Sequence, residues 1–104
     1  MPSQKKSWEV VKKMKSPIDF TLMIIIYTSE TVYKISPTAD QLDYIMGFPR
    51  KGTAAQYLPR LESVGLLERE RDCYKTAAIF KQFASESKIS EAMWNVLVKP
   101  NTPG

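Results

Sequence analysis

The sequence predicts a mainly α-helical domain that carries one small β-hairpin. Prolines, glycines and capping residues divide the chain into short apolar segments with helical spacing. One stretch, residues 66–77, instead reads as a hairpin: residues 66–70 resemble a strand, and residues 73–77 pair back across Arg71-Asp72. The 104 residues are enough for one domain with a modest core.

The first predicted helix of the central domain begins at Ser16-Pro17. Ser16 suits an N-cap, Pro17 suits the first helical position, and Asp19 falls in the first turn. We expect the helix to end between residues 28 and 33. The β-branched run 24–26 would also suit a strand, but the cap and the length favour a helix. Its buried stripe is expected to comprise Ile18, Leu22, Ile25 and Ile26.

A second predicted helix begins at Thr38 and ends at Gly47. Thr38 follows the break at Ser36-Pro37 and suits an N-cap, while Gly47 permits a left-handed stop. A turn over residues 48–52 follows, because Pro49 biases the preceding residue toward extended geometry. The inward face of this helix is expected to comprise Leu42, Ile45 and Met46.

A third predicted helix extends from about Thr53 to Val64, with Gly65 as its stop. Thr53 and Gln56 have the spacing of a capping box. Pro59 would cost about 3 kcal/mol in a straight helix, so the helix either kinks there or starts nearer Gln56. The inward face is expected to comprise Leu58, Leu61 and either Ala54 or Ala55. The outward face is expected to comprise Thr53, Gln56, Tyr57 and Arg60.

The remaining segments with apolar side chains at helical spacing are also predicted to be helices. Residues 78–87 have apolar anchors at Ile79, Phe80 and Phe83. A short helix over residues 7–15, capped by Ser7, would place Trp8, Val11 and Met14 on one face. Another short helix over residues 90–98 would place Met93, Trp94 and Leu97 on its apolar face. These patterns divide the chain into a basic N-terminal arm or short helix (1–15), a central domain (16–87) and a C-terminal helix and tail (88–104).

The composition excludes several kinds of functional site. The chain has no histidine and a single cysteine, Cys73, so it has neither an intrachain disulfide nor a Cys/His zinc site. Since it also lacks paired-carboxylate and phosphate-loop motifs, we expect no enzyme activity, metal or cofactor. The longest apolar run, residues 22–27, is too short to span a bilayer, and no secretion signal is recognised, so we expect a cytoplasmic protein.

Positive charge is concentrated in two parts of the sequence. The formal net charge is +4 and the isoelectric point is near 9.2, which suits an anionic partner. Basic residues outnumber acidic ones over 1–15 and 50–75. The stretch 16–49 is acidic, and we expect it to face away from a polyanion. Its charged residues are Lys34, Asp19, Glu30, Asp40 and Asp43.

A specific pattern of helix, glycine stop and hairpin occupies residues 57–69 and 74–76. The first part reads Tyr-Leu-Pro-Arg-Leu-Glu-Ser-Val-Gly-Leu-Leu-Glu-Arg and the second reads Tyr-Lys-Thr. With the helices around it, the order over about residues 17–85 resembles the winged helix-turn-helix family, in particular small MarR-, ArsR- and PadR-like prokaryotic, archaeal or viral regulators. Pro59 in the third helix and Cys73 near the wing turn depart from that pattern. The Cys/His ligand sets of metal-sensing members are absent.

The resemblance implies a sequence-specific double-stranded DNA-binding protein, a transcriptional regulator. Helix 53–64 would read the major groove and the wing, residues 66–77, would contact the backbone. The alternative for each implied contact residue is a solvated polar face. The implied contacts are Thr53, Gln56, Tyr57 and Arg60 from the helix, Arg50 and Lys51 before it, and Arg69, Arg71 and Lys75 from the wing.

Two alternatives concern the partners of the protein. The apolar terminal helices either join two copies into a homodimer that reads an inverted repeat or pack together within one subunit. The winged helix either binds DNA or acts as a protein–protein interaction module in a larger nucleic-acid or replication assembly. The acidic wing residues Glu68, Glu70 and Asp72 favour the second role. A DNA affinity that falls steeply with salt would favour the first.

Overall fold

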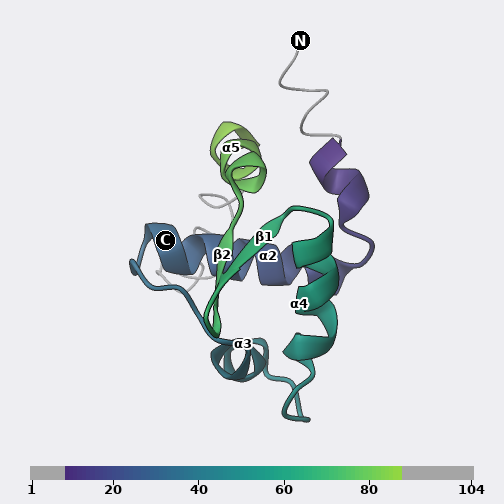
Figure 1. Cartoon of the computed structure of the whole chain (residues 1–104), viewed down its shortest axis with the longest axis vertical. Helices are drawn as coiled ribbons and strands as arrows, with labels where there is room; N and C mark the ends of the chain where they lie inside the picture. Colours follow the sequence, from purple (N-terminus) through teal and green to yellow (C-terminus); the bar gives the residue numbers. More distant parts are fainter. Residues whose placement is uncertain (1–8, 88–104) are drawn as a thin grey trace, which may run out of the picture.

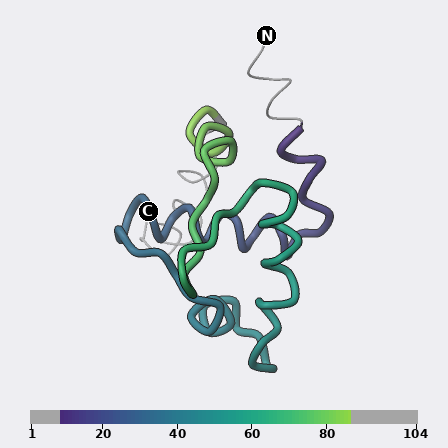
Figure 2. The backbone as a smooth tube through the Cα atoms, viewed as in Figure 1, coloured from purple at the N-terminus to yellow at the C-terminus, as the bar shows by residue number. Residues whose placement is uncertain are grey.

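A computed structural model describes residues 9–87 and confirms a mainly helical domain with a two-stranded antiparallel hairpin before its last described helix. Residues 9–13 are helical. The elements that follow are α2 (Pro17–Thr31), α3 (Ala39–Met46), α4 (Ala54–Ser63), β1 (Leu67–Glu70), β2 (Cys73–Thr76) and α5 (Ala78–Ser87). Figure 1 and the backbone trace in Figure 2 show α5 at one end of the longest axis and α3 with the loop before α4 at the other. No helix within residues 9–87 is long and apolar enough to cross a membrane.

Helix α2 is the centre of the core, and the helical interpretation of its isoleucine run is confirmed. The Ser16 hydroxyl caps it by accepting from the Asp19 N–H at 3.2 Å, and Pro17 occupies its first turn. The expected stripe was too narrow. Leu22 and Ile26 are buried and Ile18 and Ile25 partly so, but Met23 and Ile24 are buried as well. The reason is that α2 contacts both β2 and α5, so a wide sector of its surface is covered.

Helix α3 has the predicted caps but a different inward face. Thr38 and Gln41 form a full capping box, and Gly47 ends the helix with a φ of +71°. Leu42 is buried and Met46 packs partly against the core. Ile45 was expected inward but is 51% exposed. Asp43 is buried instead, because its carboxylate accepts a hydrogen bond from the Ala54 N–H at the start of α4.

Helix α4 continues without interruption through Pro59, which lies on its exposed side. Its inward face is the one expected, with Ala54 rather than Ala55 joining Leu58 and Leu61 in the core. The capping box predicted at its start is wrong. Thr53 already has helical dihedral angles and makes no side-chain cap; its hydroxyl donates to the Arg50 carbonyl at 2.7 Å.

The hairpin has the predicted register, with a two-residue turn at Arg71-Asp72. Leu67 pairs with Thr76 and Glu70 with Cys73. Arg71 adopts a φ of +60°, a left-handed conformation that glycine would adopt at lower cost. The loop before α3 adds to the sheet: the Tyr74 N–H donates to the Pro37 carbonyl at 2.8 Å, and Thr38 forms a bridge with Cys73.

The two ends of the described chain agree in part with the sequence analysis. Helix α5 has the predicted bounds, with Phe80 and Phe83 buried and Ile79 half-buried. At the other end, Val11 was expected on the apolar face of the first helix, but its side chain is 39% exposed. Its neighbour Val10 is buried in the core instead. Two further predictions lie outside the described residues. These are the position of Trp8 on the apolar face of the first helix, and the apolar face formed by Met93, Trp94 and Leu97. The homodimer therefore stays a prediction.

Candidate nucleic-acid interface

The start of α4 is organised by a carboxylate from the neighbouring helix. One oxygen of Asp43 accepts from the Gly52 N–H at 2.7 Å and the other accepts from the Ala54 N–H at 2.7 Å. Such N–H groups at a helix start are a common anion-binding site. In this protein an internal anion already occupies them, so a DNA phosphate is not expected to bind there. The Asp43 contacts instead hold the turn between α3 and α4 in shape.

The solvent-facing side of α4 differs from the one expected. Gln56 is exposed, but Thr53 and Tyr57 are half-buried. The Tyr57 ring stacks on Phe48 with a centroid distance of 6.4 Å and an interplanar angle of 18°. The exposed residues lie at helical spacing along one side, and none of them is basic: Ala55, Gln56, Pro59, Glu62 and Ser63.

The outward orientation expected for Arg60 is wrong. Its guanidinium pairs with the buried carboxylate of Asp19 and also donates to the Lys13 carbonyl at 3.1 Å. The Lys15 N–H donates to the same carboxylate at 2.9 Å. The Arg60 side chain is 34% exposed, so part of it still reaches solvent. Because its charge is matched by Asp19, Arg60 links α4 to the start of α2 and is poorly placed to read a base.

The loop before α4 carries two exposed cations, Arg50 and Lys51. The ammonium of Lys51 lies 3.8 Å from a carboxylate oxygen of Asp40 on α3, with both side chains largely exposed. An exposed pair at this distance is worth little, about 0–1 kcal/mol, and is easily exchanged for another anion. Both cations therefore remain available to an external phosphate.

The wing presents two arginines and one neutralised lysine. Arg69 donates from Nε to the Arg71 carbonyl at 2.8 Å, and its guanidinium carbon lies 5.9 Å from the centre of the Tyr74 ring. Lys75 donates to Glu70 at 2.6 Å. This hydrogen bond and the accompanying charge attraction lower the pKa of Glu70 and raise that of Lys75. Arg69 and Arg71 are therefore the wing cations most available to an external anion, and the exposed carboxylates of Glu68 and Asp72 lie near them in the sequence.

Contacts to the start of α3 bring the loop cations and the wing to one end of the molecule. Thr38, the N-cap of α3, bridges to Cys73 beside the wing turn, and Asp40 in the first turn of α3 approaches Lys51. Figure 1 shows the hairpin turn and the loop before α4 at the same end, with α3 between them. The segments that carry Arg50, Lys51 and Arg71 thus lie at one end of the molecule.

The acidic middle of the chain does not form an outer face, contrary to expectation. Asp19 and Asp43 are buried, and Glu30 accepts from the Thr76 N–H at 2.5 Å and from its hydroxyl at 2.7 Å. Only Asp40 of the four acids is exposed. The sequence contained a signal for the inward position of two of these acids. Asp19 and Glu30 fall at helical spacing with residues that are buried on α2, namely Leu22, Met23 and Ile26.

Further observations limit the chemistry of this surface. Within residues 9–87 no group of three or more histidine, cysteine, aspartate or glutamate side chains is placed to hold a metal ion. Cys73 is a half-buried free thiol beside the wing turn. Comparison of the chain with known protein families, with curated proteins and with solved structures found no match.

Proposed function

We propose that the protein is a double-stranded DNA-binding protein of winged-helix type, with transcriptional regulation as its role. The observation that carries the proposal is the anchoring of the hairpin on the loop before α3, through Tyr74 and Pro37. That contact sets the wing beside the α3–turn–α4 unit, the arrangement that winged-helix proteins use on a duplex. The hairpin and the loop before α4 carry four exposed cations: Arg50, Lys51, Arg69 and Arg71.

The proposed interface relies more on phosphates than on bases. The four cations contact the backbone, which supplies affinity independent of sequence. Gln56 is the exposed side chain of α4 best suited to base readout, since an amide pairs with adenine through two hydrogen bonds. Thr53 and Tyr57 lie at the edge of this face. Arg60 is assigned a positioning role, because its charge is matched by Asp19.

The test is a fluorescence-anisotropy titration of the full chain against random duplex DNA over a series of salt concentrations. Four phosphate contacts predict a slope of log affinity against log salt of about −3 to −4, since each contributes about −0.9. A slope near zero with measurable binding would contradict the phosphate-based interface.

A second candidate function, a protein–protein interaction module, is favoured by a different observation. None of the exposed residues of α4 is basic, and Glu62 adds a negative charge to that face. Lys75 is neutralised by Glu70 at 2.6 Å. Undetectable DNA binding at low salt would favour this module within a larger assembly, and pull-down of a protein partner would then be the next experiment.

A further inference from the structure

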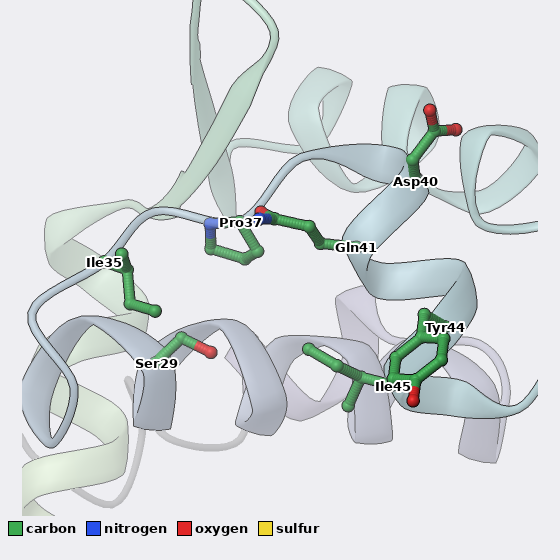
Figure 3. A pocket seen from close by; sticks show the side chains of 7 residues that line it. All are labelled: Ser29, Ile35, Pro37, Asp40, Gln41, Tyr44 and Ile45. Carbon is green, nitrogen blue, oxygen red and sulfur yellow. The ribbon is translucent and has the colours of Figure 1, made fainter.

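An apolar groove lies between the C-terminal part of α2 and α3. Its volume is about 410 Å³. Figure 3 shows its walls: Ser29 and Ile35 on one side, Tyr44 and Ile45 on the other, and Pro37 between them. Tyr44 is 88% exposed, Ile35 59% and Ile45 51%. Large apolar side chains clustered at such exposure are typical of a binding surface.

Three of the polar side chains at the groove have partners within the chain. The Ser29 hydroxyl donates to the Ile25 carbonyl at 2.8 Å. The side-chain oxygen of Gln41 accepts from the Thr38 N–H at 2.9 Å. Asp40 lies at the edge and approaches Lys51. The groove therefore offers mainly apolar contact, with Tyr44 as a further polar group in its lining, and its occupant should be an apolar segment with at least one large side chain.

The chain carries such a segment beyond its described part. Five of the six residues 93–98 are apolar: Met93, Trp94, Val96, Leu97 and Val98. A tryptophan in such a segment supplies a large apolar surface for a groove formed by Ile35, Tyr44 and Ile45. No charged residue lies between Glu91 and Lys99.

The segment is tethered to a helix that packs on α2 beside the groove. Helix α5 packs on α2, with the ring centroids of Phe80 and Tyr27 6.1 Å apart and Lys81 3.9 Å from Glu30. Ser29, which directly precedes Glu30 on α2, lines the groove. Trp94 is seven residues beyond the end of α5. An extended chain of that length spans about 23 Å, at about 3.3 Å per residue.

We propose that the groove between α2 and α3 binds residues 93–98 of the same chain, with Trp94 as the main contact. A tether of this length keeps the segment at an effective concentration of about millimolar, so a modest apolar contact is enough to hold it. This is the intramolecular alternative to a homodimer built from the C-terminal segment. It is independent of DNA binding.

The test uses tryptophan fluorescence of the full chain with the substitution Trp8→Phe, which leaves Trp94 as the one tryptophan. We expect blue-shifted emission and slow acrylamide quenching. Adding Ile35→Asp should shift the emission to the red and raise the quenching rate several-fold, because a charge enters the groove. The matched control is Val11→Asp, which places the same charge at an exposed apolar residue outside the groove and should change neither quantity. Circular dichroism verifies that each variant is folded.

Sedimentation equilibrium on the same samples identifies the source of the segment. A monomer with a protected Trp94 that responds to Ile35→Asp supports the proposal. Protection that increases with protein concentration, in step with dimer formation, would assign the groove to a second copy and overturn it. A solvent-exposed Trp94 in the parent chain, or a protected Trp94 indifferent to Ile35→Asp, would also overturn it.

Discussion

Arg60 on α4 pairs with Asp19 in the first turn of α2, although the two residues are 41 positions apart in the sequence. Asp19 is almost completely buried, whereas the Arg60 side chain keeps about a third of its surface in solvent. The pair joins three segments, since the same arginine reaches the Lys13 carbonyl and the same carboxylate accepts from Lys15. An arginine at a helix position that suggested base readout therefore holds the fold together.

Replacing Arg60 is predicted to affect stability before specificity. Arg60→Ala leaves the Asp19 carboxylate buried without its cation, which should lower the free energy of unfolding by about 2–3 kcal/mol. This loss is smaller than the roughly 3–5 kcal/mol for breaking a fully buried pair, because the arginine is partly exposed. Urea denaturation measures the change. The control Arg50→Ala, which removes an exposed arginine, should stay within about 0.5 kcal/mol of the parent. A stable Arg60→Ala protein that has lost preference for one base pair would restore Arg60 as a reader.

Asp43 is predicted to be the residue that caps α4. Asp43→Ala removes two hydrogen bonds, to the N–H groups of Gly52 and Ala54, and should lower the free energy of unfolding by about 2–3 kcal/mol. Thr53→Ala, at the position where the sequence suggested a cap, should cost about 0.5 kcal/mol or less. Thermal and urea denaturation of the two variants compare them directly. Equal losses would argue that Thr53 shares the capping role.

Glu70 is predicted to limit DNA affinity by neutralising Lys75. Glu70→Gln removes the carboxylate 2.6 Å from the ammonium, so Lys75 becomes available to a phosphate. We expect tighter binding to random duplex DNA and a salt slope steeper by about one. Glu62→Gln on α4 is the charge-matched control and should raise affinity without the full change in slope. An unchanged slope for Glu70→Gln would place Lys75 outside the interface.

The pH dependence of the Glu70–Lys75 pair follows from the two pKa shifts. The folded pKa of Glu70 is lowered, so its contribution to stability is present above the usual value of 4.5 and is lost as the pH falls through the lower folded pKa. The folded pKa of Lys75 is raised, so its contribution is present below the usual 10.5 and is lost only as the pH rises beyond that. Carboxyl NMR titration should find the Glu70 midpoint below 4.5 and should find it higher after Lys75→Ala.

Arg71→Gly is predicted to move stability and DNA affinity in opposite directions. Arg71 has a φ of +60°, and relieving a side chain in that conformation should stabilise the hairpin by about 1 kcal/mol. Losing the cation should weaken binding to all duplex sequences and reduce the salt slope by about one. Lys81→Ala on α5, at the opposite end of the molecule, removes the same charge and should leave the slope unchanged. Unaltered DNA affinity in Arg71→Gly would exclude the wing tip from the interface.

Local signals in the sequence determined the elements and several of their ends. Ser16-Pro17 and Thr38 start helices and Gly47 ends one because their side chains or dihedral angles act within four residues. The reversal at Arg71-Asp72 was likewise predicted from the sequence, and it agrees with the observed pairing of Glu70 with Cys73. The candidate cations Arg50, Lys51, Arg69 and Arg71 were also identified from sequence, since exposed charged residues in loops and hairpins need no distant partner.

Only the tertiary structure decided where the charged side chains of the core point. Asp43 caps a helix that begins 11 residues later, and Arg60 turns toward a carboxylate 41 residues earlier. Helical spacing fixes which residues share a face, but not which other element covers that face. A buried carboxylate is stabilised only by donors that the fold brings to it, so these orientations depend on the packing of α2, α3 and α4 against one another.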